Sequence, residues 1–478
     1  MGLPSLDRAK IVIIGAGPTG LGAAHRLQEL GISNFVLFEK ESHAGGLASS
    51  FVDREGFTWD VGGHVQFSHY GYFDDLMDRL LGGEWLHHER QAWVWMRERF
   101  IPYPFQNNIR HLPPAELRDC LRGLIACVRN GNNGGGPANF EEWIHRSFGE
   151  GIARHFMMPY NFKVWAYPPS DLAFYWIGER VAQIDLERIV MNIAEGRDDV
   201  SWGPNNLFRF PERGGTGEIW RRLAATLPAR SLVFGKSIAR VETRKRQVIF
   251  TDDSREEYDI LISTMPLDRL VCSSDRDDLK QAAGDLLRST THIVGVGLRG
   301  APAEQLRKKC WMYFPESNAP FYRVTVFSNY SPNNVPDAER YWSLMGEVSE
   351  SPAKPVERDK VVEETIAGMR ACGLIESAAD VVSTWSYRAE HGYPTPSLGR
   401  NAALEGLLPA LERDGIFSRG RFGAWKYEVS NQDHSLMQGV ELVDRLAEGN
   451  EELTLNRPNE VNSGKRAATA RPRAVSHG

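Results

Sequence analysis

The sequence predicts an α/β fold in which a parallel sheet is combined with an inserted helical domain and an antiparallel β-sheet domain. Three observations lead to this fold. A short apolar run at 10–14 opens into a glycine-rich turn and a helix, and the next apolar run ends at Glu39. Apolar residues follow helical spacing at 115–129, 140–148 and 175–195. Closely spaced β-rich runs then occupy 231–264 and 292–387, and their short connections favour antiparallel pairing.

Gly15, Gly17 and Gly20 form a GxGxxG motif, with Pro18 and Thr19 inside it, between the first strand and its helix. Glycines permit a tight turn and a close approach of the backbone to a pyrophosphate, and the helix N-terminus offers unpaired N–H groups. Glu39 ends the next strand, where its carboxylate can accept hydrogen bonds from ribose hydroxyls. A glycine-rich turn without a ligand is the alternative. The strand, the glycines, the helix and the acidic residue occur in the order and spacing of a dinucleotide-binding motif, which favours binding of an adenine dinucleotide.

Later segments favour FAD over NAD. ESHAGGLASS, which contains Gly46 and Leu47, follows the Glu39 strand, and FPERGGTG and YDILISTMP lie far downstream. An N-terminal motif with distant second contributions resembles FAD enzymes of the glutathione-reductase and amine-oxidase type. We therefore expect a Rossmann-like, discontinuous FAD-binding domain (1–109, 201–290 and 401–456), a helical substrate-binding domain (110–200), an antiparallel sheet substrate domain (291–400) and a tail (457–478). The tail carries five Lys or Arg against one Glu, which predicts disorder.

Composition excludes several classes of function. Apolar residues make up 42% of the chain, and the formal net charge of −6 gives no basic field that would recruit nucleic acid. No apolar run approaches the length of a membrane span, and MGLPSLDRAK lacks a signal-peptide core, so we expect no membrane insertion. The five cysteines lack CxxC spacing, which predicts reduced thiols, a cytoplasmic location and no metal site.

Eight stretches, in one order from about residue 10 to about 456, resemble the eukaryotic-type, fungal-like branch of the UDP-galactopyranose mutases. They are WDVGGHVQFSHYGYFDD (59–75), YPFQNNI (103–109), PYNFKVW (159–165), GERVA (178–182), WGPNNLFRFPERGGTG (202–217), CWMYFPESNAPFYRVTVFSNYSP (310–332), HGYPTP (391–396) and GRFGAWKYEVSNQDHS (420–435). The resemblance implies an isomerase that interconverts UDP-galactopyranose and UDP-galactofuranose without net redox. In that family the N5 atom of reduced FAD attacks the anomeric carbon and a flavin–sugar iminium follows.

The resemblance also implies roles for individual residues. Arg180 and Arg323 match two diphosphate-binding arginines, whose planar guanidinium groups can each pair two phosphate oxygens. The phenols that donate further hydrogen bonds to the phosphates match Tyr313, Tyr330, Tyr393 and Tyr427. The uracil pocket matches Tyr103, Phe105 and Gln106, with Asn161 and Trp165 on the same side, and the sugar lies near Asn205 and Trp311. Flavin contacts match Arg421, Asn431, Gln432 and Ser435.

His64, in DVGGHVQFSHYGYF, allows several interpretations: a general base, a metal ligand, a core residue or a support for the flavin. No metal ligands lie at useful spacing, and the family mechanism assigns the nucleophile to the flavin. We expect Gly62 and Gly63 to let the backbone pass close to the flavin ring, with the Gly63 carbonyl accepting the N5 proton. His64 then packs its ring against the flavin, in a loop that shifts with redox state.

Three other questions stay open at this point. A flavin oxidase resembling amine oxidases would share the scaffold but needs an apolar substrate tunnel, and a non-catalytic UDP-sugar binder would not turn over. The accepted sugar can also be a relative of galactose, and Gln66 replaces an aliphatic residue common in fungal relatives. Arg90 resembles a residue that receives NADPH, whereas Ala92 replaces a hydroxyl-bearing residue, so NAD(P)H is only a candidate reductant. Oligomeric state cannot be inferred.

Overall fold

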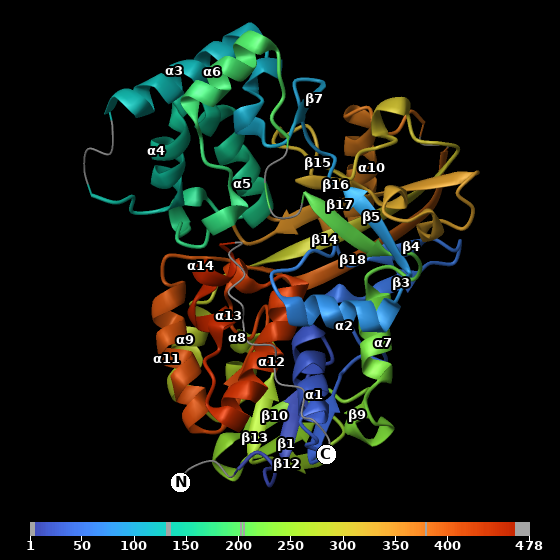
Figure 1. The fold of residues 1–478 in the computed structure, drawn as a ribbon, viewed down its shortest axis with the longest axis vertical. Helices are drawn as coiled ribbons and strands as arrows, with labels where there is room; N and C mark the ends of the chain where they lie inside the picture. The colour runs from blue at the N-terminus through green and yellow to red at the C-terminus, as the bar shows by residue number, and fades with distance from the viewer. Residues whose placement is uncertain (1–4, 131–134, 201–202, 204–205, 378–379, 464–478) are drawn as a thin grey trace.

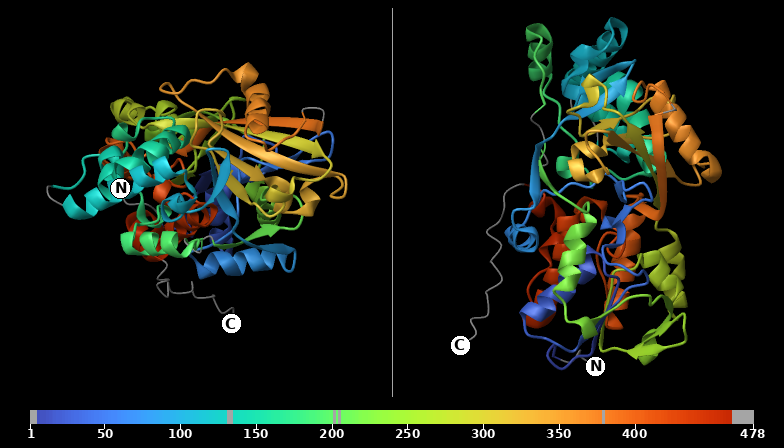
Figure 2. Two further views of the ribbon diagram at one scale, coloured as in Figure 1. Left: turned by 90° about the horizontal axis from the view of Figure 1, so that it is seen from above. Right: turned by 90° about the vertical axis from the view of Figure 1, so that its right-hand side faces the viewer.

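We describe the protein from a computed structural model that covers residues 5–130, 135–200, 203, 206–377 and 380–463. In Figure 1 the parallel sheet and its helices form the lower half of the molecule. The helical insertion and the long antiparallel strands lie next to each other above it. The right-hand view of Figure 2 shows the same upper and lower parts from the side. Both expected substrate domains therefore stand over one end of the expected cofactor domain.

A five-stranded parallel sheet forms the centre of the lower half. Its strands, in spatial order, are β19 (Ile416–Ser418), β13 (Ile260–Ser263), β1 (Ile11–Ile14), β2 (Phe35–Phe38) and β9 (Leu232–Val233). All four residues of β1 are apolar and buried, as a parallel strand covered on both faces requires. Alternate side chains of β1 join different hydrophobic clusters on the two faces of the sheet.

Helices and a small sheet cover the two faces. One face packs against α1 (Pro18–Glu29), α2 (Gly71–Leu81), α7 (Gly217–Ala225) and α12 (Gln432–Glu448). The other packs against α8 (Leu267–Cys272), α9 (Lys280–Gly284), α11 (Arg400–Arg413) and the antiparallel strands β10 (Ile238–Glu242), β11 (Gln247–Phe250) and β12 (Arg255–Glu257). Gly439 lets α12 lie against α1, because a Cβ there would be 2.1 Å from the Thr19 carbonyl oxygen.

The antiparallel prediction for 231–264 was wrong for two of its four runs. SIARVE and QVIFTD pair antiparallel, but SLVFG supplies β9 and DILIST supplies β13, which are parallel to β2 and β1. The run DILIST is apolar throughout, which is typical of a strand buried on both faces. The short connections suggested that strands adjacent in sequence pair with each other, but β13 pairs with β1 and β19 instead.

A seven-stranded sheet forms one part of the upper half. Its strands, in spatial order, are β18 (Val381–Pro394), β14 (Arg288–Arg299), β17 (Tyr341–Glu350), β16 (Arg323–Val326), β15 (Trp311–Tyr313), β6 (Ala92–Met96) and β7 (Arg99–Pro102). All pairs are antiparallel except β15 with β6. We expected residues 1–109 to belong to the cofactor domain. Residues 92–102 instead contain β6 and β7, which extend this sheet. Helix α10 (Val361–Ala371) packs on the sheet.

Two short ladders connect the upper and lower halves. They are β3 (Ser50–Val52) with β4 (Thr58–Asp60) and β5 (Trp85–Glu89) with β8 (Leu207–Pro211). The helical insertion contains α3 (Pro114–Asn130), α4 (Phe140–Ile152), a π-helical turn (Ala153–Met157), α5 (Met158–Trp165) and α6 (Leu186–Glu195). Helix was expected across 175–195, but only a short turn at Gly178–Arg180 precedes α6.

The segment after 456 is not wholly irregular. Helix α13 (Leu453–Asn456) is followed by α14 (Pro458–Val461), and Asn462 is buried, although we expected disorder from residue 457. Residues 464–478 lie outside the described part. All five cysteines are free thiols. Within the described ranges, no helix is both long enough and apolar enough to cross a bilayer.

Candidate active site

The glycine-rich turn connects β1 to α1 and has the geometry that a dinucleotide needs. Gly15 has a φ of +98°, and a Cβ on Gly20 would lie 1.9 Å from the Gly15 carbonyl oxygen. At Gly17 a Cβ would approach only Gly45 and Gly46, at 3.9 and 4.0 Å, so the turn opens onto a narrow backbone-lined cradle. The N-terminus of α1 points its unpaired N–H groups into this region, where they favour an anion. These residues fit the diphosphate of FAD.

Glu39 lies directly beside this turn. Its Oε2 accepts a hydrogen bond of 2.7 Å from the N–H of Ala16, and its Oε1 accepts one of 2.9 Å from Glu41. The side chain is 6% exposed. Gly46 begins a short turn with Leu47 on the opposite side of the cradle. The structure therefore places five of the expected cofactor residues around one glycine-lined space: Gly15, Gly17, Gly20, Glu39 and Gly46.

The loop that contains His64 passes between the two halves of the molecule. Gly62 has a φ of +107°, which strongly favours glycine. At Gly63 a Cβ would lie 2.8 Å from Thr325 Oγ1 and 3.3 Å from Glu347 Oε1, so a larger residue would not fit. Burial lowers the pKa of His64 to about 4 and therefore keeps the ring neutral at pH 7. Its Nδ1 is buried and has no hydrogen-bond partner among the described residues.

Arg323 on β16 is held by the carboxylate of Glu347, which no sequence motif singled out. Glu347 on β17 is 2% exposed and accepts three short hydrogen bonds from Arg323, at 2.7, 2.8 and 2.9 Å. The phenol of Tyr322 donates to Glu347 Oε2 at 2.6 Å, and the N–H of Gly63 donates to Oε1 at 3.0 Å. Burial alone would raise the pKa of Glu347, but these donors hold it below its ordinary value. Glu347 thus connects an expected substrate arginine to the expected cofactor loop.

Arg180 occupies a different setting at the end of a short turn, Gly178–Arg180. Its Nη2 donates to the carbonyl oxygen of Glu428 at 2.7 Å, and its guanidinium lies 5.3 Å from the centre of the Tyr427 ring. Its Nη1 is buried and has no hydrogen-bond partner in the part of the chain that the structure describes. A buried guanidinium nitrogen with a free N–H is suited to an anionic ligand.

Aromatic rings connect the two arginines. Tyr427 lies 5.8 Å from Tyr393, whose ring lies 6.5 Å from Tyr322, the residue before Arg323. Tyr313 lies 5.2 Å from Tyr103 and its hydroxyl accepts a hydrogen bond of 2.7 Å from Trp311. Tyr160, which is not among the predicted substrate residues, also contacts Tyr313, with ring centres 5.4 Å apart. Burial raises the pKa of the Tyr103, Tyr160, Tyr313, Tyr322 and Tyr393 phenols. They are therefore neutral hydrogen-bond donors at pH 7.

Other expected substrate residues lie deeper in the helical core. Phe105 is fully buried and stacks on Phe156, with ring centres 4.4 Å apart. Gln106 donates to the Ala182 carbonyl at 2.9 Å, and Asn161 donates to the Met157 carbonyl at 2.7 Å. Trp165 packs on Tyr427 at 4.8 Å. Asn205 lies outside the described residues.

Tyr330 and Gln66 lie toward the β5–β8 ladder. The Tyr330 hydroxyl is buried and has no hydrogen-bond partner within the described ranges, and its ring packs among Phe208, Phe210 and Phe327. Gln66 is 2% exposed and lines a cavity of about 400 Å³ together with residues of β5 and β8.

The remaining expected flavin residues surround the start of α12. Asn431 precedes the helix, and Gln432 accepts a hydrogen bond of 2.8 Å from the Trp220 indole. Ser435 is 5% exposed. Arg421 donates to the Gly392 carbonyl at 2.9 Å and to Ser430 Oγ at 2.8 Å, and burial lowers its pKa.

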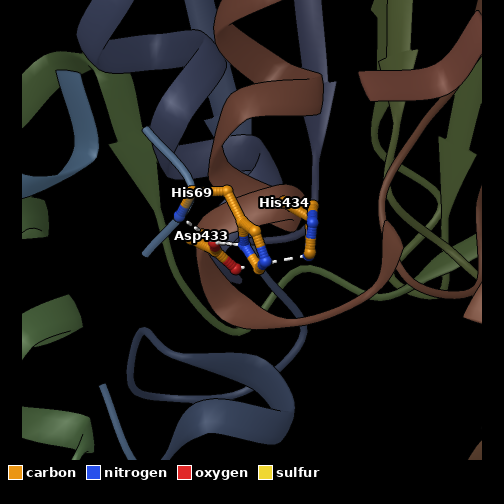
Figure 3. Close-up of side chains that lie close together, drawn as sticks. All are labelled: His69, Asp433 and His434. Carbon is orange, nitrogen blue, oxygen red and sulfur yellow. Dashed lines mark hydrogen bonds and ion pairs between the residues drawn. The ribbon is translucent and has the colours of Figure 1, made fainter. Parts of the chain in front are cut away.

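His69, Asp433 and His434 meet beside this helix start, and their ligand atoms lie within 4.8 Å of one another (Figure 3). Asp433 Oδ2 accepts hydrogen bonds from His69 Nδ1 at 2.7 Å and from the His69 backbone N–H at 3.0 Å. The His69 and His434 rings lie 4.6 Å apart. Residues of this kind can bind a metal ion, but here the contacts form a hydrogen-bonded network that fastens the His64 loop to α12.

Comparisons with known proteins agree with this geometry. The family model for flavin-containing amine oxidoreductases matches residues 18–399. The crystal structure of a reduced UDP-galactopyranose mutase superimposes with a TM-score of 0.93 at 50% identity, and the match covers 95% of this chain and 97% of that one. A putative protoporphyrinogen oxidase from Exiguobacterium sp. has a TM-score of 0.70 at 15% identity, over 93% of this chain and 99% of that one, and shares the fold alone.

Curated proteins match over shorter segments. Mitochondrial protoporphyrinogen oxidase from Nicotiana tabacum is 38% identical over 71 residues, which are 15% of this chain and 14% of that protein. A possible lysine-specific histone demethylase 1 from Drosophila melanogaster is 34% identical over 80 residues, 17% of this chain and 9% of that protein. The chain therefore matches only a small part of the length of either of these relatives.

Proposed function

We propose that this chain, which belongs to the flavin-containing amine oxidoreductases and within them to the UDP-galactopyranose mutases, interconverts UDP-galactopyranose and UDP-galactofuranose. The observation that carries the proposal is the pair of arginines joined by phenols above the glycine-lined cradle. Among the described residues, Arg180 Nη1 is buried and unpaired. The rings of Tyr427 and Tyr393 lead from Arg180 to Tyr322, the residue before Arg323, and the Tyr393 phenol is neutral. This lining suits a diphosphate and not the apolar substrate of an oxidase.

The residues of the chain bind, orient and shield the substrate. Arg180 and Arg323 hold the diphosphate and stabilise it when the sugar–phosphate bond breaks, and each charged hydrogen bond contributes about 1.5–3 kcal/mol. Tyr313, Tyr330, Tyr393 and Tyr427 donate further hydrogen bonds to the phosphates. When bound and reduced, FAD supplies the nucleophilic nitrogen that takes the sugar from UDP without net oxidation.

Other residues hold the two ends of the substrate. We assign uracil binding to Tyr103, Phe105 and Gln106, supported by Asn161 and Trp165, and we assign the sugar side to Trp311 and Asn205. Phe105 and Gln106 already contact Phe156 and Ala182, so they would shape the uracil pocket from behind. Arg421, Asn431, Gln432 and Ser435 complete the flavin site at the start of α12. The five free thiols fit a reducing compartment such as the cytoplasm.

The Gly62–His64 loop supports the flavin ring in this proposal. Its glycines would let the backbone approach a bound flavin closely, the Gly63 carbonyl would offer an acceptor to the reduced ring, and His64 would support that ring. A His64→Ala protein should lose turnover and show a shifted flavin absorbance spectrum, whereas His87→Ala, at an exposed position on β5, should not. Full activity with an unchanged spectrum in His64→Ala would contradict the proposed role.

Product analysis tests the function itself. The flavoprotein is incubated anaerobically with UDP-galactofuranose, with and without dithionite, and the products are separated by chromatography. Conversion to UDP-galactopyranose only in the reduced sample supports the mutase, and no conversion with intact reduced FAD would refute it for this substrate. A panel of UDP-sugars then defines the accepted sugar. Replacing dithionite by NADPH or NADH tests the physiological reductant, for which Arg90 is the candidate contact.

A further inference from the structure

The last described residues of the chain reach the substrate side of the molecule. Asn462 follows α14 and is 4% exposed. Its Nδ2 donates to the carbonyl oxygen of Glu428 at 2.8 Å, and its Oδ1 lies 3.0 Å from His434 Nε2. A backbone carbonyl can only accept, so the amide has a single orientation and His434 must donate from Nε2. Asn462 therefore bridges α12 and the turn at Glu428.

The Glu428 carbonyl is a shared acceptor. Arg180 Nη2 donates to the same oxygen at 2.7 Å. The carboxylate of Glu428 pairs with Arg400 at 2.7 and 2.8 Å, and both side chains are buried. Tyr427, whose ring faces Arg180, belongs to the same short turn, Tyr427–Val429. Arg180 is thus oriented by one turn of backbone, and that turn is held in place by Arg400 and Asn462.

The other side of Asn462 leads to the cofactor loop. The His434 ring lies 4.6 Å from the His69 ring, and the neighbouring Asp433 accepts two hydrogen bonds from His69 (Figure 3). His69 lies in the stretch that begins with Gly62–His64. Burial lowers the pKa of His434 to about 4, which agrees with a neutral ring that carries its hydrogen on Nε2. Asn462 is consequently the junction between the flavin loop and Arg180.

We propose that Asn462 is a positioning residue for Arg180, acting through the Glu428 carbonyl that both side chains share. In the described part of the chain, the Arg180 guanidinium makes a single hydrogen bond, to the Glu428 carbonyl. If Asn462 fixes that carbonyl, it fixes the direction in which Arg180 Nη1 meets the diphosphate. This inference rests on the proposed function, because it assumes a diphosphate ligand at Arg180.

A double-mutant cycle on UDP affinity tests the inference in the full-length flavoprotein. Calorimetry measures the dissociation constant of UDP for the wild type, Asn462→Ala, Arg180→Ala and the double variant. Loss of one hydrogen bond at Glu428 should weaken UDP binding about tenfold in the wild-type background. In the Arg180→Ala background the same change should matter less than about twofold. An equal loss in both backgrounds, or no loss in either, would overturn the proposal.

Two further variants complete the experiment. Asn462→Asp keeps the acceptor for His434 but loses the N–H to Glu428, so it should weaken UDP binding while the flavin absorbance stays unchanged. If Asn462→Ala does not fold, Asn462→Asp takes its place in the experiment. Undiminished UDP affinity of Asn462→Asp would overturn the proposal. Ser463→Ala is the matched control, exposed in the same segment, and should bind UDP normally. If the wild type itself binds no UDP, the proposed function fails; if UDP binds and the cycle is additive, only this inference fails.

Discussion

Arg323 and Arg180 are expected to bind the same diphosphate, but the two regions that carry them differ in construction. Arg323 projects from a central strand of a seven-stranded sheet, and a buried carboxylate contacts it three times. Arg180 ends a short turn, and among the described residues its guanidinium makes one hydrogen bond, to a backbone carbonyl. The difference shows how one site can combine a preorganised cation with one that keeps a donor free for the incoming ligand.

Removing either arginine should produce the largest effects on activity, and the two variants should differ in stability. Arg323→Ala and Arg180→Ala should each lower kcat/KM by about 10³-fold, since each loses charged hydrogen bonds to the diphosphate. Only Arg323→Ala should also lower the thermal midpoint by several degrees, because it leaves Glu347 buried without its partner, at a cost of about 3–5 kcal/mol. Turnover of UDP-galactofuranose and thermal melts measure both.

Arg299→Ala, at an exposed position at the end of β14, serves as the control for both measurements. Equal loss of stability in Arg180→Ala and Arg323→Ala would show that the two regions are not built differently. Lower stability in Arg299→Ala would show that the melts respond to loss of any arginine.

Glu347→Gln should have a smaller effect, which sharpens the description of the Arg323 region. The amide keeps the size of the side chain but loses the charge that pairs with Arg323 and one acceptor for Tyr322 or Gly63. We expect kcat/KM to fall about 10–100-fold, together with a change in the flavin absorbance spectrum, because Gly63 belongs to the flavin loop.

Tyr322→Phe is the matched variant for Glu347→Gln. It removes one hydrogen bond to Glu347 and leaves the ion pair, so kcat/KM should fall by no more than about tenfold. A larger loss in Tyr322→Phe than in Glu347→Gln would mean that the phenol, not the carboxylate, organises this region.

The smallest expected effect is on pH dependence. Arg323, Tyr322 and Gly63 hold the pKa of Glu347 below its ordinary value of 4.5. A lowered pKa means that the carboxylate contributes fully above that value and that its contribution is lost only as the pH falls through the lowered pKa. The ratio of kcat/KM between the wild type and Glu347→Gln should therefore stay constant from about pH 5.5 to about pH 8.5. A ratio that varies tenfold across this range would place the titration of Glu347 inside it.

Much of the cofactor region could be predicted from the sequence. The strand, the glycine turn, the helix and Glu39 follow one another within 30 residues, so their geometry is set by local backbone preferences. The helical insertion was recognisable for the same reason, apart from 175–185, where only a short turn forms. Substrate residues such as Arg180 could be proposed because their motifs resemble one family, not because any local pattern requires an arginine there.

By itself, the sequence determined the fold class, from the order of its apolar runs, and the dinucleotide turn, which is encoded in one contiguous stretch. It offered the two arginines only as candidates, through motifs that resemble one family. Only the tertiary structure decided what holds those arginines. Gly63 and Glu347 are 284 residues apart in the chain, and Asn462 meets Glu428 across 34 residues, so no local periodicity reports either contact. The same holds for β13, whose parallel partners β1 and β19 are distant in sequence. Such contacts depend on the packing of whole elements that are distant in the sequence.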